Sequence, residues 1–474
     1  MKDKLLFSED FLYNEAMLDN YFRTDINFDV VGTGFHMGDR RAKLYFVDGF
    51  VNSEVSEQVM NFMMKSPEKF RKNMTAEEFA ESVISYIEIE ISDDINKIAK
   101  VVYSGAIVLI VSGFATGFLI KTRSYPKRSV EEPDNDKVLR GSHDGFVESL
   151  LINTALIRRR IRDRGLIIET MEAGKRSRTD IAICYLEDKA DKKMLANIKK
   201  RIEKIDVNTL NMSQESLLEC LVKKQILNPF PKVRFTERPD AAASCVAEGS
   251  IILIVDNSPA AMIVPTGFFE FLQDTNDYYF PPVVGTYLRF IRGVIFGLAL
   301  FLSPVWYLLV NNPQYIPSWL NCITIKEYYS VPVIVQLLII EMVIDTLKLA
   351  SLNTPNSLSN SFSVIGALVL GDLAVSAELF SSEVVLLMAF VAIANFAQPS
   401  LELGYAFKLS RIFILVLTAI FDLRGFVAGT VIMALVLSLT KTVSGRSYLY
   451  PLIPFNGKAL SRLFFRHPIN RDNT

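Results

Sequence analysis

The stretch TYLRFIRGVIFGLALFLSPVWYLLV, residues 286–310, decides the fold class of this chain. Its charged residues are Arg289 and Arg292, both near its start, and the apolar remainder approaches the roughly 20 residues that a helix needs to cross a bilayer. Basic residues at one end of an apolar span favour the cytoplasmic side for that end. We therefore predict a transmembrane helix that begins near residue 286 at the cytoplasmic surface.

The charged residues divide the chain at about the same point. Residues 285–474 hold 13 of the 51 Lys and Arg residues and 9 of the 52 Asp and Glu residues. The charge density thus falls from that of a soluble protein to that of a membrane-embedded chain. A net charge of −1 over the whole chain does not indicate a nucleic-acid partner.

Four more apolar stretches are predicted to enter the membrane, namely residues 331–350, 361–380, 383–398 and 412–440. The last is long enough for a kinked or double passage, interrupted around Asp422, Arg424 and Gly425. The N-terminus lacks an apolar run long enough for a signal peptide, and the tail is basic, so both ends are expected in the cytoplasm. Two cytoplasmic ends require an even number of crossings, and we expect four with a re-entrant pair.

Residues 101–120 are uncharged over a similar length, but we predict that they do not cross the membrane. Residues 105–122 (GAIVLIVSGFATGFLIKT) resemble residues 249–266 (GSIILIVDNSPAAMIVPT). The Asp-Asn-Ser-Pro sequence in the second copy indicates a turn between two apolar runs rich in Ile and Val. Both copies are therefore predicted to be hairpins of buried strands.

The resemblance extends upstream, where residues 42–63 parallel residues 180–202. Each segment is a β-run, an acidic turn and a helix, with Asn52 or Asp191 expected at the N-cap. The offsets between the copies, about 139 and 144 residues, agree within a small insertion. The predicted fold class is an α/β cytosolic region of two related subdomains plus an all-α polytopic transmembrane domain. Its parts are subdomain 1 (1–135), a charged helical linker (136–169), subdomain 2 (170–284), the transmembrane domain (285–445) and a cytosolic tail (446–474).

The linker carries a dense polar pattern, followed by the basic run 158–160. His143, Asp144 and Glu148 could be acid/base groups or metal ligands, but a turn before a charged helix beginning near Phe146 is favoured. The basic run could meet anionic headgroups, and a solvated or interdomain face is favoured. Four isolated Cys and three His disfavour a disulfide framework or a structural zinc site. We expect neither enzymatic activity nor a cofactor.

Ionisable residues in the predicted membrane domain are informative because burying one in lipid costs several kcal/mol. Glu341, Asp345 and Lys348 share one helix face, which must line water, meet another subunit or pair internally. Lys348 could neutralise one carboxylate, which would leave that face negative. Small residues surround Asp372 and Glu378, as at an oligomer seam or a hydrated path. These five residues form the predicted pore or polar membrane face.

Several motifs together resemble the spore germinant receptor A subunits, the GerA family. One is the linker signature Arg140, Gly141, Asp144, Gly145, Phe146 and Glu148, with Asn153 after it. Residues 448–454 are similar to the closing motif of the family, with Ser447 in place of its first Pro, and residues 364–371 to a Gly-Ala-Leu helix, with Asp372 in place of Gln. Residues 154–163 and 228–240 resemble the stage V sporulation branch. Leu349 and Asn353 depart from the receptor pattern.

The resemblance implies a multi-pass protein of the inner spore membrane that acts in germination. It further implies an oligomeric ring, expected to be a pentamer, that conducts ions and works with other germination membrane proteins and membrane lipids. A ring of carboxylates would favour monovalent cations. The alternatives are a transporter component for dipicolinate and its cation, or a non-conducting scaffold. A transporter should show an internal repeat in its membrane part, and the repeat lies in the soluble part.

Overall fold

A computed structural model of the chain divides into two compact units, each described here by itself. Unit 1 comprises residues 1–224 and 233–265, and unit 2 comprises residues 225–232 and 266–474. The structure describes residues 6–51, 57, 60, 61, 63–65, 74–83, 89–120, 141–222, 228–274, 276–326, 329–353 and 374–465.

The first half of unit 1 is an antiparallel sheet between helices. Its strand order is β1-β2-β4-β5-β3. The strands are β1 (Val30–Met37), β2 (Arg40–Val47), β3 (Ile89–Ser92), β4 (Ile107–Val111) and β5 (Gly117–Ile120), and the helices are α1 (Phe11–Phe22), α3 (Ala76–Val83) and α4 (Ile95–Val102). Alternate residues of β4 contribute to two separate apolar clusters, one with α1 and α4 and one with α3. Both faces of the sheet are therefore buried, which explains the continuous apolar sequence of β4.

The second half of unit 1 repeats this topology, with the strand order β6-β7-β9-β10-β8. Its strands are β6 (Leu166–Ala173), β7 (Thr179–Leu186), β8 (Arg234–Thr236), β9 (Ile251–Val255) and β10 (Ala261–Val264), and its helices are α5 (Leu150–Arg160), α6 (Lys192–Glu203), α7 (Ser213–Leu221) and α8 (Pro239–Ala247). The start of β7 lies 139 residues after that of β2, and the start of β9 lies 144 after that of β4. These are the offsets predicted from the sequence, and both predicted hairpins are confirmed as the antiparallel pairs β4–β5 and β9–β10.

Helix starts in unit 1 partly follow the sequence signals. The carboxylate of Asp191 accepts hydrogen bonds from the backbone of Lys193 and Met194, so the predicted N-cap of α6 is confirmed. Asn52 lies outside the described residues. Helix α5 begins at Leu150 rather than near Phe146. Residues 142–147 have no regular secondary structure, and the Phe146 backbone N–H donates to the Glu237 carbonyl, 2.8 Å away.

A buried ion pair joins the two halves of unit 1. The guanidinium of Arg158 on α5 donates hydrogen bonds of 2.8 and 2.9 Å to the two carboxylate oxygens of Asp29, and neither side chain is exposed. A third donor of Arg158 reaches the Leu166 carbonyl at 2.9 Å. The Phe28 N–H also donates to the Ile168 carbonyl. The interdomain role favoured for the basic run is thus confirmed for Arg158.

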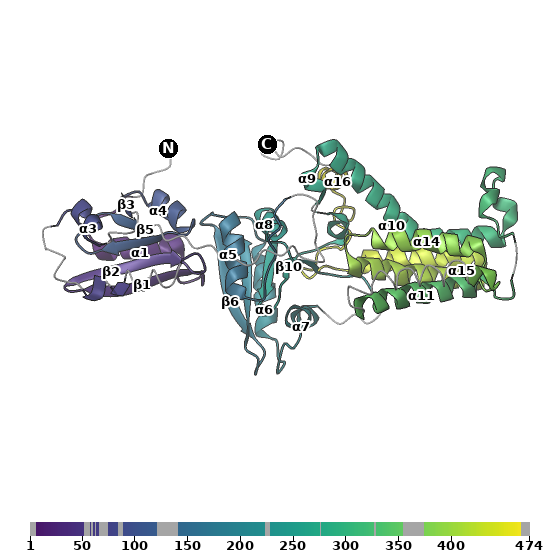
Figure 1. Cartoon of the computed structure of the whole chain (residues 1–474), viewed down its shortest axis with the longest axis horizontal. Helices are drawn as coiled ribbons and strands as arrows, with labels where there is room; N and C mark the ends of the chain where they lie inside the picture. Colours follow the sequence, from purple (N-terminus) through teal and green to yellow (C-terminus); the bar gives the residue numbers. More distant parts are fainter. Residues whose placement is uncertain are drawn as a thin grey trace. The chain divides into compact units, whose positions relative to one another are not determined.

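The described part of unit 2 is helical (Figure 1). Its helices are α9 (Asn276–Tyr279), α10 (Pro282–Asn311), α11 (Val333–Asn353), α13 (Ala374–Ser376), α14 (Ser382–Phe396), α15 (Leu401–Leu439) and α16 (Gly457–Phe464). Length and composition alone would allow α10 and α15 to cross a membrane, and α14 is a shorter apolar helix. The predicted spans 286–310, 331–350 and 383–398 correspond to α10, α11 and α14. Most of the span predicted at 361–380 lies outside the described residues.

Helix α15 is a helical hairpin. Asp422 has a non-helical backbone, with φ 53° and ψ −135°, as the predicted break around this residue requires. A Cβ on Gly425 would clash with the Leu417 carbonyl oxygen, and one on Gly429 would lie 3.2 Å from the Ile414 Cα. Residues on opposite sides of Asp422 therefore touch, and glycine allows the two arms to approach this closely. The arms, residues 401–421 and 423–439, are about 31 and 25 Å long, close to the thickness of a hydrocarbon core.

A short segment before β8 packs within unit 2. We call residues 228–232 the strap. The ring of Phe230 lies 6.3 Å from that of Phe407 on α15, and the Tyr448 hydroxyl donates to the Pro231 carbonyl at 2.7 Å. The Asn228 amide donates to the Thr440 hydroxyl, also at 2.7 Å. The strap therefore packs against the first arm of α15 and against residues that follow its second arm.

The buried pair in unit 1 generates the first prediction. Replacing Arg158 with Met leaves the Asp29 charge buried without its partner, so the free energy of unfolding of unit 1 should fall by about 3–5 kcal/mol. Cys184 offers a probe, because it is fully buried near this pair and burial raises the pKa of its thiol. The measurement is the urea dependence of Cys184 labelling, resolved by peptide mass spectrometry.

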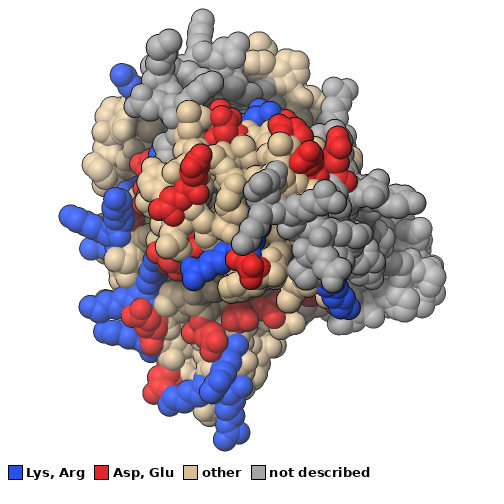
Figure 2. Space-filling model, turned by 90° about the vertical axis from the view of Figure 1, so that its left-hand side faces the viewer, with Lys and Arg blue, Asp and Glu red and all other residues tan. Residues whose placement is uncertain are grey.

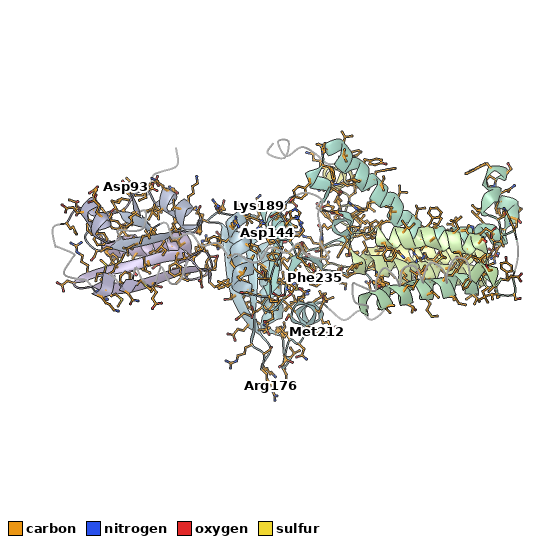
Figure 3. The ribbon with its side chains drawn as sticks, viewed as in Figure 1. Asp93, Asp144, Arg176, Lys189, Met212 and Phe235 are labelled. Carbon is orange, nitrogen blue, oxygen red and sulfur yellow. The ribbon has the colours of Figure 1, made fainter. Side chains whose placement is uncertain are left out.

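Two variants test whether the unpaired buried charge of Asp29 causes this loss of stability. Asp29→Leu combined with Arg158→Met leaves no unpaired charge and should recover much of the lost stability. Arg176→Met removes the same type of side chain from an exposed position (Figure 3) and should change little. Equal stability of Arg158→Met and Arg176→Met would contradict the role of the pair.

Candidate functional site

Four charged side chains of unit 2 meet between two helices. Glu341 of α11 contacts two cations of α15, Arg411 at 2.6 Å and Lys408 at 3.1 Å. Lys408 also pairs with Asp345, one turn beyond Glu341. We call these residues the charge cluster. Its two carboxylates and two cations balance, which is the condition for retaining charges inside an apolar bundle.

The charge cluster is buried unequally. The side chains of Glu341 and Lys408 are each 8% exposed and that of Arg411 is not exposed, whereas that of Asp345 is 38% exposed. Arg411 also donates to the Ala299 carbonyl of α10, so the cluster links three helices. Asp345 is the member that another molecule or water can reach.

The expectation of a surplus negative charge on the α11 face is wrong. It assumed that Lys348 was the cation available to Glu341 and Asp345, and the structure supplies Lys408 and Arg411 from a different helix. The Lys348 ammonium lies 4.5 Å from the ring centroid of Tyr405 and 5.6 Å from that of Phe396, within range of a cation–π interaction.

The sequence contained a signal for the two missed residues. Lys408 and Arg411 are charged, stand three residues apart, and interrupt the apolar first arm of α15. The predicted span began at residue 412 and left them just outside. Glu378 lies past the end of α13, exposed and with a positive φ of 57°, and Asp372 lies outside the described residues.

A small polar pocket adjoins the charge cluster. It has a volume of about 30 Å³, enough for one or two water molecules, and its polar lining includes Asp345, Lys348, Asn395, Tyr405 and Lys408. Among the described residues, the buried Asn395 side-chain oxygen has no hydrogen-bond partner. An unpaired buried polar atom is costly, and water is the usual remedy. The pocket therefore has the chemistry of a hydrated site.

The linker signature is a structural element of unit 1. Asp144, which is labelled in Figure 3, pairs with Arg160 at 2.6 Å in the second half of the unit. Burial alone would raise the pKa of Asp144, but hydrogen bonds from Arg160 and Ser142 outweigh it and place the pKa below its ordinary value. The pair therefore stabilises the fold above the ordinary range of Asp, and this contribution is lost as the pH falls through the lowered pKa.

The other signature residues pack or close the loop. Phe146 is buried, and the Asn153 amide oxygen accepts from the Val147 N–H at 2.7 Å. The Glu148 carbonyl accepts from the Asn257 N–H at 2.8 Å, and Arg140 lies outside the described residues. Gly141 has a φ of 120°, which favours glycine, and Gly145 is buried. Within the described ranges, no group of three His, Cys, Asp or Glu residues could hold a metal ion.

Comparison with known proteins gives consistent matches over almost the whole chain. Residues 16–474 match the family described as Bacillus/Clostridium GerA spore germination protein. Stage V sporulation protein AF of Bacillus subtilis (strain 168) is 37% identical over 96% of this chain and 92% of that protein. Spore germination protein KA of the same organism is 28% identical over 89% and 78%. The crystal structure of the N-terminal domain of the A subunit of the Bacillus megaterium spore germinant receptor GerK3 covers 55% of this chain and 97% of that one, at 22% identity and a TM-score of 0.43.

The charge cluster generates the second prediction. Arg411→Leu leaves Glu341 with one of its two cations in a buried position, so the chain should lose about 3–5 kcal/mol of stability. The measurement is the thermal unfolding temperature in detergent. Arg424→Leu is the matched control, because Arg424 lies on the second arm of the same helix and is exposed. An equal unfolding temperature in the two variants would show that the cluster contributes little.

Proposed function

This chain belongs to the GerA family of spore germination proteins, and on that basis we propose that it is a membrane subunit of a spore germination complex that conducts ions as a homo-oligomer. Its place would be the inner spore membrane, with the soluble unit and the C-terminal tail in the cytoplasm. The names of its relatives support germination and sporulation as the process. We propose no catalytic role.

The observation that carries this proposal is the exposed carboxylate of Asp345. It lies in the middle of α11, which is 21 residues long and otherwise mostly apolar. A charged side chain at that depth cannot face hydrocarbon without a cost of several kcal/mol. Its exposed side must therefore meet water or another protein surface, and an oligomer enclosing a hydrated path provides both.

The proposed preference for cations also rests on Asp345. The charge cluster is neutral as a whole, and within it Glu341, Lys408 and Arg411 are buried, so Asp345 is the member whose charge is open to a neighbouring path. The partly exposed carboxylate of Asp345 would then repeat once per subunit around the axis of a ring. Rings of Asp or Glu are a recurring source of cation selectivity.

Unit 1 supports a role in assembly. It is a duplicated α/β scaffold whose described residues contain no metal cluster, and its family signature is used for packing and loop closure. Acidic and basic side chains are interspersed on the face shown in Figure 2, as expected of a surface in water. We propose that this unit contacts further copies and other germination membrane proteins.

The third prediction concerns ion flux through vesicles that contain the purified full-length chain. Asp345→Asn should leave assembly intact, because this residue is the least buried member of the charge cluster. It should shift the permeability ratio from cations toward anions, since the carboxylate charge is removed from the path. The measurement is the reversal potential in a salt gradient, with oligomer size recorded by microscopy.

Glu383→Gln on α14 is the matched control, because it removes a carboxylate near a helix start and outside the charge cluster. Its permeability ratio should equal that of the unmodified chain. An assembled Asp345→Asn variant with an unchanged ratio would contradict the pore-lining role of Asp345. An assembled chain that passes no ions at all would favour the scaffold alternative.

A further inference from the structure

An apolar groove separates the start of α10 from the end of α16. It has a volume of about 460 Å³ and almost no polar surface, and its walls are Val283, Thr286, Tyr287, Phe290, Phe464 and Phe465. We call it the α10–α16 groove. Its size is within the usual range for binding sites of small organic ligands, roughly 300–1,000 Å³. Phe290 is 69% exposed and Phe465 is 58% exposed, so the groove is open to the surroundings of the chain.

The sequence of α10 fixes the depth of this groove in a bilayer. After Arg292, the helix continues without a charged residue to its end at Asn311. That run is about 28 Å long, close to the hydrocarbon thickness. The first eleven residues of α10, which form one wall of the groove, therefore extend into the headgroup layer. Tyr side chains, here that of Tyr287, are enriched at this level because one end of the ring is polar.

Helix α16 is held at the same depth. The Arg289 guanidinium donates to the Leu463 carbonyl at 3.2 Å, so the end of α16 is fastened to the first turns of α10. Figure 1 shows the two helices side by side at this point. Arg289 and Arg292 are themselves paired with the buried Asp277, which anchors the start of α10.

The charge around α16 indicates the type of headgroup. Lys458 lies exposed in its first turn, and the sequence from residue 457 to the C-terminus contains four Lys and Arg residues and one Asp. Basic segments next to a membrane-spanning helix attract anionic lipids, at about 1 kcal/mol per Lys or Arg. An apolar groove at headgroup depth and a nearby basic segment are complementary to the two ends of one ligand.

We propose that the α10–α16 groove binds an anionic phospholipid, with an acyl chain between Phe290 and Phe464 and the headgroup near Lys458. This inference rests on the membrane insertion that forms part of the proposed function, and it is independent of ion conduction. Bound lipid would cover an apolar surface that the described part of the chain leaves open.

The test uses the full-length chain in nanodiscs that contain a phosphatidylglycerol with a photoactivatable acyl chain. After illumination, labelled peptides are mapped by mass spectrometry. We expect labelling of the peptides that contain Phe290 and Phe464. Phe464→Ala combined with Phe465→Ala should lower this labelling about fivefold, because two half-exposed rings that contact the lipid acyl chain are removed.

A matched control and a charge variant sharpen the result. Leu386→Ala combined with Phe390→Ala removes two similarly exposed apolar side chains from α14, and groove labelling should be unchanged. Lys458→Glu should lower labelling by phosphatidylglycerol relative to labelling by phosphatidylcholine with the same acyl probe. Labelling by phosphatidylglycerol that the groove variant does not reduce would overturn the proposal, as would groove peptides crosslinked to a second copy of the chain.

Failure of this inference can be distinguished from failure of the proposed function. A chain that does not enter nanodiscs would overturn membrane insertion and the lipid site together. A chain that enters nanodiscs and conducts ions, but carries no acyl label in the groove, would overturn the lipid site alone.

Discussion

The packing of unit 2 depends on the pairing of Glu341 with Arg411. Both side chains are buried among apolar helices, where either charge without the other would be costly. Since α11 carries the carboxylate and α15 carries the cation, the pair specifies which helices become neighbours and in which register. Its link to the Ala299 carbonyl extends this specification to α10. Apolar side chains can form similar van der Waals contacts in many registers of two helices, whereas these polar contacts form in only one register.

The same solution appears in unit 1. Asp29 and Arg158 form a fully buried pair between the two halves of that unit, where the basic run of α5 supplies the cation. The pair thus joins two subdomains that share one sheet topology. In both units the polar pair fixes an arrangement that apolar packing alone leaves less defined.

Local and repeated features of the fold were predictable, and contacts between distant segments were not. The two hairpins, their offsets and the break at Asp422 follow from apolar runs, turn residues and the comparison of one segment with another. The partners of Glu341 lie 67 and 70 residues further along the chain, so spacing along a single helix could not identify them. Nearness in sequence favours Lys348 as the partner of Asp345, whereas the position of Lys348 over the Tyr405 ring depends on tertiary packing. For the same reason, the linker motif identifies Asp144 but not its partner, because Arg160 is one of three consecutive Arg residues.

The strap gives the chain an unusual connectivity. The polypeptide passes between the units three times, after residues 224, 232 and 265. Residues 225–232, which include the strap, belong to unit 2, while residues 1–224 and 233–265 belong to unit 1. The strap is fastened within unit 2 by hydrogen bonds at Asn228 and Pro231. Tension on either flank of the strap would therefore act on Thr440, directly after the second arm of α15, and on Tyr448, further along the chain. After a cut following residue 265, the strap would belong to the N-terminal fragment. It would still pack within unit 2 and so hold the two fragments together.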